Sequence, residues 1–197
     1  MSDRYVNLIR RTRPRMGLAT FAVLAIALAM GGRALLADLA SRAIADRWLL
    51  VVAPVLAYEV GFLGYQLRRL GLEGFGGLLS IGVPNFVTMV RGKLYAATAG
   101  FLLVPPELPL LAWMPGICYG LGAALDWVDG AVARRFGWTS EVGESLDLAF
   151  DTLGFLIAPL VGVVWGRLPV FYLSLSAARY LFIAGTWWRQ RRGRPVF

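Results

Sequence analysis

The sequence predicts an all-α integral membrane protein, a bundle of about six transmembrane helices preceded by an amphipathic surface helix. Hydrophobic residues make up 58% of the 197 residues and charged residues only 16%, with a mean hydropathy of +0.63. A chain this apolar is not an ordinary soluble domain. Apolar runs of about twenty residues also recur along it, and each is long enough to cross a bilayer as a helix.

The predicted elements follow one another in a simple order. Residues 1–16 are a basic amphipathic juxtamembrane segment, whose arginines and spaced apolar residues suit the surface of an anionic leaflet. Two additional N-terminal transmembrane helices occupy 17–70, a helical core occupies 82–190, and a basic tail follows at 191–197. The six spans are expected at 17–36, 48–67, 85–103, 108–134, 144–165 and 168–188.

The charge distribution indicates partners and orientation. The net charge is +8, but the arginines gather at the termini and between apolar runs, without an aromatic-interleaved basic surface. Anionic lipid headgroups are therefore expected as partners, and nucleic acid is not. Six spans place both termini on one side, and the positive-inside rule makes that side cytoplasmic, together with the stretch 126–151. Tryptophans near span ends, such as Trp48, are expected at the membrane interface.

The stretch 126–151 places four aspartates in an otherwise apolar chain. Asp126 and Asp129 are three residues apart, and Asp147 and Asp151 are four apart, so each pair shares one face of a helix. The polar link between the pairs contains a glycine and suits a turn between antiparallel helices, which would bring the carboxylates together. Such oxygen ligands fit Mg²⁺, Mn²⁺ or Ca²⁺. Because the chain has no histidine, carboxylates must do any acid and base work.

This stretch resembles the signature of the CDP-alcohol phosphotransferase (CDP-alcohol phosphatidyltransferase) family, D-x2-D-G-x2-A-R-x8-G-x3-D-x3-D. The matching positions are Asp126, Asp129, Gly130, Ala133, Arg134, Gly143, Asp147 and Asp151. The resemblance covers about residues 82–190. It implies a membrane enzyme of phospholipid biosynthesis that moves a substituted phosphoryl group, above all phosphatidyl, from a CDP-linked donor such as CDP-diacylglycerol to an alcohol acceptor, releasing CMP.

The resemblance also implies roles for the matching residues. Asp126, Asp129 and Asp147 would hold two divalent ions, Mg²⁺ or Mn²⁺, with Asp151 contributing to the metal site and serving as the catalytic base that takes the acceptor's proton. The residues expected to bind the nucleotide are Gly130, Ala133, Arg134 and Gly143.

Further polar residues lie inside predicted spans. Asn85, Thr88 and Arg91 occupy positions that resemble the family's first core helix, and we assign the first two to nucleotide binding and Arg91 to acceptor binding. Alternatively, Asn85 caps the helix, Thr88 bonds its own backbone and Arg91 is a satisfied polar residue. Arg179 could bind a phosphate of the acceptor, and Glu59 could pair with an arginine or face a polar crevice, since charges inside membranes are usually paired or functional.

The helix order departs from the family's pattern. Family members resemble a six-helix bundle in which three spans follow the signature helices, whereas one complete span follows here and two precede. Either the leading pair substitutes for the missing pair, or the chain is a fragment of a larger protein.

Two other functions stay open. An intramembrane prenyltransferase would have aspartate-rich repeats on two separate helices, and a divalent-cation transporter would have its acidic site at mid-membrane. The identity of the acceptor alcohol is also open. So is the oligomeric state, although a bundle of this kind is compatible with a homodimer.

Overall fold

The structure, a computed structural model, describes residues 15–69, 82–104, 106, 109–136 and 141–192. Within these residues every regular element is helical, as predicted. The α-helices are α2 (Arg15–Leu39), α3 (Arg42–Arg69), α4 (Gly82–Gly100), α5 (Pro109–Phe136), α6 (Glu141–Val164) and α7 (Leu173–Arg191), and two short 3-10 helices are η1 (Phe101–Leu103) and η2 (Val170–Tyr172).

Three of the described helices are long and apolar enough to cross a membrane. These segments are Gly17–Leu39, Arg42–Arg69 and Val142–Val164. They make the chain an integral membrane protein, while the count of six spans stays a prediction. Most of the predicted surface helix at 1–16 and of the basic tail at 191–197 lies outside the described residues.

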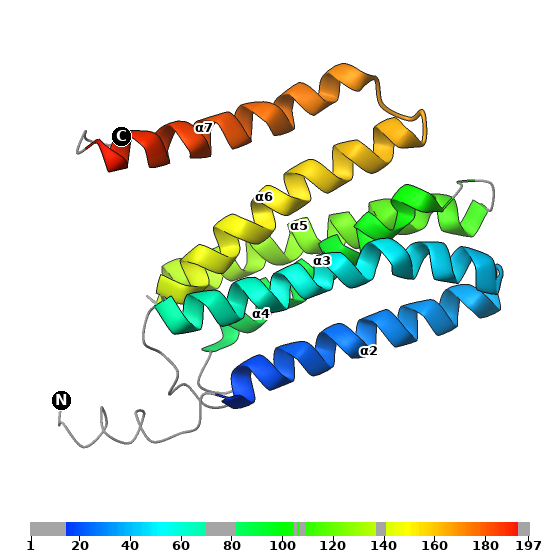
Figure 1. Cartoon of the computed structure of the whole chain (residues 1–197), viewed down its shortest axis with the longest axis horizontal. Coiled ribbons are helices and arrows are strands. Elements are labelled where there is room, and N and C mark those ends of the chain that lie inside the picture. The colour runs from blue at the N-terminus through cyan, green and yellow to red at the C-terminus, as the bar shows by residue number, and fades with distance from the viewer. Residues whose placement is uncertain (1–14, 70–81, 105, 107–108, 137–140, 193–197) are drawn as a thin grey trace.

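Helix α4 is the centre of the bundle. It packs against α2, α3, α5 and α6, while α2 lies along one flank and α7 contacts α6 on the other (Figure 1). Small residues on α4, including Ala96 and Ala99, are almost completely buried. Small side chains let helix backbones approach closely in membranes, where no hydrophobic force drives helices together, so the sequence of α4 suits its central position.

Trp48 joins α3 to α4 from inside the bundle. Its side chain is only 3% exposed, and its indole Nε1 donates a hydrogen bond to the carbonyl of Ala97 at 3.0 Å. A Cβ at Gly32 of α2 or Gly100 of α4 would collide with the Trp48 ring, so both glycines make room for it. Trp48, which we expected at the membrane interface, thus has its side chain inside the bundle, and its depth in the membrane stays a prediction.

Tyr95 fills the junction of α4, α5 and α6. It is 4% exposed, and a Cβ built at Gly122 of α5 or at Gly154 of α6 would lie 2.6 Å or 2.9 Å from its ring. Such distances are below van der Waals contact, and overpacking a filled core costs about 1–3 kcal/mol. The tyrosine therefore requires a glycine on each neighbouring helix.

We expect Gly122→Ala to lower the free energy of unfolding by about 1–3 kcal/mol, because the new methyl group displaces the Tyr95 ring. Thermal or denaturant unfolding of the detergent-purified protein measures the change. Gly120→Ala is the matched control on the same helix, since nothing lies within 4 Å of a Cβ there. Equal stability of the two variants would contradict the packing.

Candidate active site

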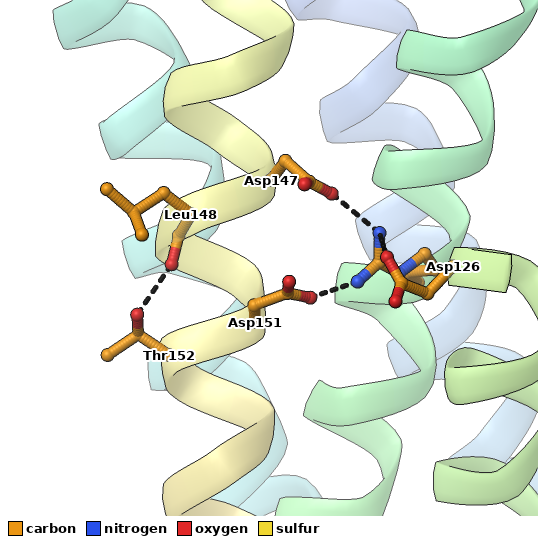
Figure 2. Close-up of polar contacts among 6 residues, drawn as sticks. Asp126, Asp147, Leu148, Asp151 and Thr152 are labelled. Atoms are coloured by element: carbon orange, nitrogen blue, oxygen red, sulfur yellow. Dashed lines mark hydrogen bonds and ion pairs between the residues drawn. The ribbon is translucent and has the colours of Figure 1, made fainter. Parts of the chain in front are cut away.

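Carboxylates of two neighbouring helices meet beside α4. Asp126 projects from α5, and Asp147 and Asp151 project from the same face of α6, one helical turn apart (Figure 2). One oxygen from each of the three side chains lies within 4.8 Å of the other two. The predicted convergence of Asp126 with the second aspartate pair is thus present in the structure.

Arg91 of α4 lies between these three carboxylates. Its Nη1 is 2.8 Å from Asp126 Oδ1 and 2.6 Å from Asp147 Oδ1, and its Nη2 donates to Asp151 Oδ1. The guanidinium is planar with donors in a fixed fork, so it can hold several carboxylate oxygens at once. Arg91 therefore joins α4 electrostatically to both signature helices.

Exposure differs sharply within this cluster. The Arg91 side chain is 1% exposed and that of Asp151 is 21% exposed, whereas Asp147 and Asp126 are 44% and 50% exposed. The arginine therefore forms the closed base of the site, and the two outer aspartates form its open side. A ligand would reach Asp126 and Asp147 first and Asp151 last.

The site lies part-way along α5 and α6 rather than at the tips of these helices. Helix α5 continues from Asp126 to Phe136, which at 1.5 Å per residue is about 15 Å. Helix α6 begins at Glu141, about 9 Å before Asp147 along its axis. Helices α5 and α6 therefore both extend past the carboxylates.

The other predicted residues fall on the same helices. Gly130 is half-buried on α5, Gly143 is buried in the first turn of α6, and Thr88 is buried on α4. The backbones of four more lie in α4 and α5, but their side chains are outside the described residues: Asn85, Asp129, Ala133 and Arg134.

Arg179 of α7 lies near enough to Asp151 to act on its carboxylate electrostatically. Its guanidinium carbon is 4.7 Å from the centre of the Phe155 ring, one turn after Asp151 on α6. The structure thus places Arg179 beside the site helix, in a cation–π contact rather than in an ion pair with an aspartate. Its proposed contact with the acceptor stays a prediction.

Sequence reasoning overlooked Lys93. Its ammonium donates to Glu59 Oε2 of α3 at 2.7 Å and lies 3.3 Å from the centre of the Phe21 ring of α2. The Glu59 side chain is 0% exposed and that of Lys93 9% exposed. A lysine in the middle of a span was itself a signal, since charges in membranes are rare and usually paired. Glu59 does pair with a cation, but with a lysine instead of an arginine.

The donor set fits a divalent cation. When ionised, the three carboxylates and Arg91 sum to a charge of −2. All the ligand atoms are hard oxygens, which suits Mg²⁺ or Mn²⁺. Oxygens around one octahedral ion at about 2.1 Å lie about 3 to 4.2 Å apart. The observed limit of 4.8 Å is slightly above this range, so the side chains would have to turn towards one another to bind one ion.

Helices long enough to cross a membrane, with carboxylates converging from two adjacent helices, define an integral membrane protein with a candidate metal site. The chain belongs to the CDP-alcohol phosphatidyltransferase family, whose model matches residues 81–196. Members of this family are transferases of phosphate-containing groups in phospholipid biosynthesis. The family uses a divalent metal, and the described residues offer it the cluster of Asp126, Asp147 and Asp151.

Two relatives are similar to this chain over about half of its length. A Mycobacterium tuberculosis protein named "Putative cardiolipin synthase" is 30% identical over 118 residues, which cover 58% of this chain and 54% of the relative. A Yersinia enterocolitica protein named CDP-diacylglycerol–glycerol-3-phosphate 3-phosphatidyltransferase is 29% identical over 103 residues, 51% of this chain and 53% of the relative. The chain thus spans about half the length of the curated relatives it matches. No solved structure matches it significantly.

Proposed function

We propose that this protein transfers a phosphatidyl group from CDP-diacylglycerol to an alcohol acceptor and releases CMP. The observation that carries the proposal is the meeting of Asp126, Asp147 and Asp151 within 4.8 Å, beside a buried arginine and inside the part of the chain that the family model matches. An acidic cluster of this kind can hold the cations that neutralise a pyrophosphate.

The metal site is assigned to four aspartates. Asp126, Asp129 and Asp147 would hold two divalent ions, Mg²⁺ or Mn²⁺, with Asp151 as a further ligand. Bound there, the ions would neutralise charge on the pyrophosphate and stabilise the leaving CMP. Asp126 and Asp147 suit this role because they are the more exposed members of the cluster.

Asp151 is assigned as the base. Its Oδ1 accepts a hydrogen bond from Arg91, which orients the carboxylate, and Oδ2 would take the proton of the acceptor hydroxyl. The hydroxyl oxygen then forms a bond to the phosphatidyl phosphorus, and the bond between that phosphorus and the oxygen of CMP breaks. Because Asp151 is the least exposed of the three aspartates, few waters can compete with the alcohol for this position.

The remaining roles concern substrate binding. Arg91 and Arg179 are assigned to the acceptor, although in the structure Arg91 is engaged with the aspartates and would have to contact the acceptor from its place among them. The residues assigned to the nucleotide are Gly130, Ala133, Arg134 and Gly143 of the signature, with Asn85 and Thr88 of α4.

The orientation and domain organisation are also proposed. Loop charge places the active site and both termini on the cytoplasmic side. Residues 82–190 would be the phosphotransferase core, with 1–16 and 191–197 as basic flanks and 17–70 as a helix pair packed on that core. A homodimer is compatible with this arrangement. Among acceptors, the name of the Yersinia relative puts glycerol 3-phosphate first.

We expect CDP or CMP together with Mg²⁺ to raise the midpoint of thermal unfolding of the purified protein. A ligand at 100 times its Kd that binds only the folded state stabilises it by about 2.7 kcal/mol. Mg²⁺ alone and GDP with Mg²⁺ are the controls. If cytidine nucleotides leave the midpoint of thermal unfolding unchanged, the proposal is contradicted. A prenyltransferase or a cation transporter would then be the better candidate.

The acceptor can be identified by screening. Purified protein with labelled CDP-diacylglycerol and Mn²⁺ or Mg²⁺ is supplied in turn with glycerol 3-phosphate, inositol phosphate, serine and a lipid alcohol. CMP release is expected with one of these, and glycerol 3-phosphate is the first candidate.

A further inference from the structure

A groove runs along the outside of α6, between α3 and α7. It has a volume of about 560 Å³, within the usual range for small-molecule sites. Its walls and floor combine Phe62 and Tyr65 of α3, Ala149 and Thr152 of α6, and Tyr180 and Ile183 of α7. Helix α3 precedes residues 81–196, so one wall lies outside the region that the family model matches.

The groove is separate from the acidic cluster. Successive residues of a helix are rotated by 100°, so Ser145, Ala149 and Thr152 lie about 150° around α6 from Asp147 and Asp151. Figure 2 shows Leu148 and Thr152, which both line the groove, on the other side of α6 from the two aspartates. A molecule in the groove would therefore not contact the carboxylates.

The polarity of the groove changes along its length. Towards the middle of α6 it is apolar, and the Thr152 hydroxyl there already donates to the Leu148 carbonyl at 2.6 Å. At the other end lie Arg69 in the last turn of α3 and Ser145 in the early turns of α6. The groove thus has an apolar body and one cationic end.

Gln66 lies at the polar end of the groove and carries an unsatisfied hydrogen-bonding atom. Its side chain is 5% exposed and lines the groove, and its buried Oε1 has no hydrogen-bond partner among the residues that the structure describes. A buried polar atom without a partner costs about 1–3 kcal/mol, so a small rotation of the Gln66 side chain towards a ligand hydroxyl in the groove would be favourable. The guanidinium of Arg69, which lines the same end of the groove, can form an ion pair with a phosphate.

A lipid fits this groove better than another helix does. Helix pairs in membranes favour small residues on both faces, whereas two sides of this groove carry Phe62, Tyr65 and Tyr180. An acyl chain is much thinner and can follow the groove along α6.

We propose that the groove binds one anionic phospholipid, with an acyl chain along α6, its phosphate at Arg69 and a headgroup hydroxyl at Gln66. This lipid is not the reacting donor, since the groove lies on the far side of α6 from the carboxylates. It would fill the space between α3 and α7 and hold these helices against α6, so its binding does not depend on the proposed reaction.

Native mass spectrometry of the delipidated protein tests this proposal, with phosphatidylglycerol and phosphatidylcholine added back in separate titrations. Phosphatidylglycerol has a net negative charge and headgroup hydroxyls, whereas the phosphate charge of phosphatidylcholine is cancelled by its own ammonium and its headgroup has no hydroxyl, so one tightly bound phosphatidylglycerol per chain is expected. Arg69→Gln should weaken phosphatidylglycerol binding about five-fold, the equivalent of about 1 kcal/mol, and should weaken phosphatidylcholine binding much less. Arg68→Gln is the matched control, because Arg68 is exposed on the same turn and does not line the groove.

A second variant tests the body of the groove. Ala149→Trp should abolish the tight phosphatidylglycerol peak by filling the floor, while Ile26→Trp, which adds a similar bulk on the exposed face of α2, should not. Equal binding of the two lipids, equal effects of Arg69→Gln and Arg68→Gln, or full binding by a folded Ala149→Trp protein would each overturn the proposal. A dimer in which the contact between the two subunits covers Ala149 would also overturn the proposal.

Discussion

Asp151→Asn is expected to lower the rate of CMP release from CDP-diacylglycerol by about 10²–10⁴-fold, the usual contribution of a general base. The amide oxygen of asparagine can still accept the hydrogen bond from Arg91, so the local structure should persist. What is lost is the carboxylate that takes the acceptor's proton. CMP release measures the rate, and thermal stabilisation by Mn²⁺ measures metal binding, which should be largely kept.

Two further variants separate the base from the metal site. Asp126→Asn should lose both activity and stabilisation by Mn²⁺, because Asp126 is one of the exposed aspartates assigned as ligands. Glu144→Gln should change neither, because Glu144 is an exposed carboxylate on α6 outside the signature. Full activity of Asp151→Asn would contradict the assignment of Asp151 as the base. It would not contradict the assignment of the metal site.

Lys93→Met should be among the most destabilising single changes in the chain. It leaves the completely buried Glu59 carboxylate without its cation, and breaking a buried pair in this way costs about 3–5 kcal/mol. Unfolding of the purified protein by denaturant measures the loss. The effect should be large because the pair lies where α2, α3 and α4 meet, with Phe21 below the ammonium.

The double variant Glu59→Gln with Lys93→Met removes both charges and should recover most of the lost stability, since replacing a whole buried pair is often nearly neutral. Arg33→Met is the control for a surface pair. Its partner Asp46 is 2.7 Å away, but the two side chains are 36% and 56% exposed, so the loss should stay below about 1 kcal/mol. A double variant as unstable as Lys93→Met would show that the charge pair is not the cause.

The buried pair also bears on the role of the two N-terminal helices. Lys93 lies two residues after Arg91 on α4, so the contact with Glu59 holds α3 against the helix that carries the arginine of the site. Trp48 makes a second connection between α3 and α4. These polar contacts hold the helix pair at 17–70 against α4, in agreement with the proposal that the pair packs on the core.

Much of the fold could be predicted from the sequence, because it rests on local patterns. Runs of apolar residues determine where helices form in a membrane, since every backbone group there must bond within its own segment. The spacing of Asp147 and Asp151 determines that they share a face of α6, because helical geometry relates residues four apart. The signature pattern around Asp126 predicted the family, and the match of the family model to residues 81–196 confirms it.

Only the tertiary structure decided which distant residues meet. It placed Arg91 among the three aspartates, paired Lys93 with Glu59, buried Trp48 and formed the groove between α3, α6 and α7. The physical reason is that each of these contacts depends on how one helix is rotated and displaced against another. The packing of the whole bundle determines that arrangement, and the periodicity of a single helix contains no information about it.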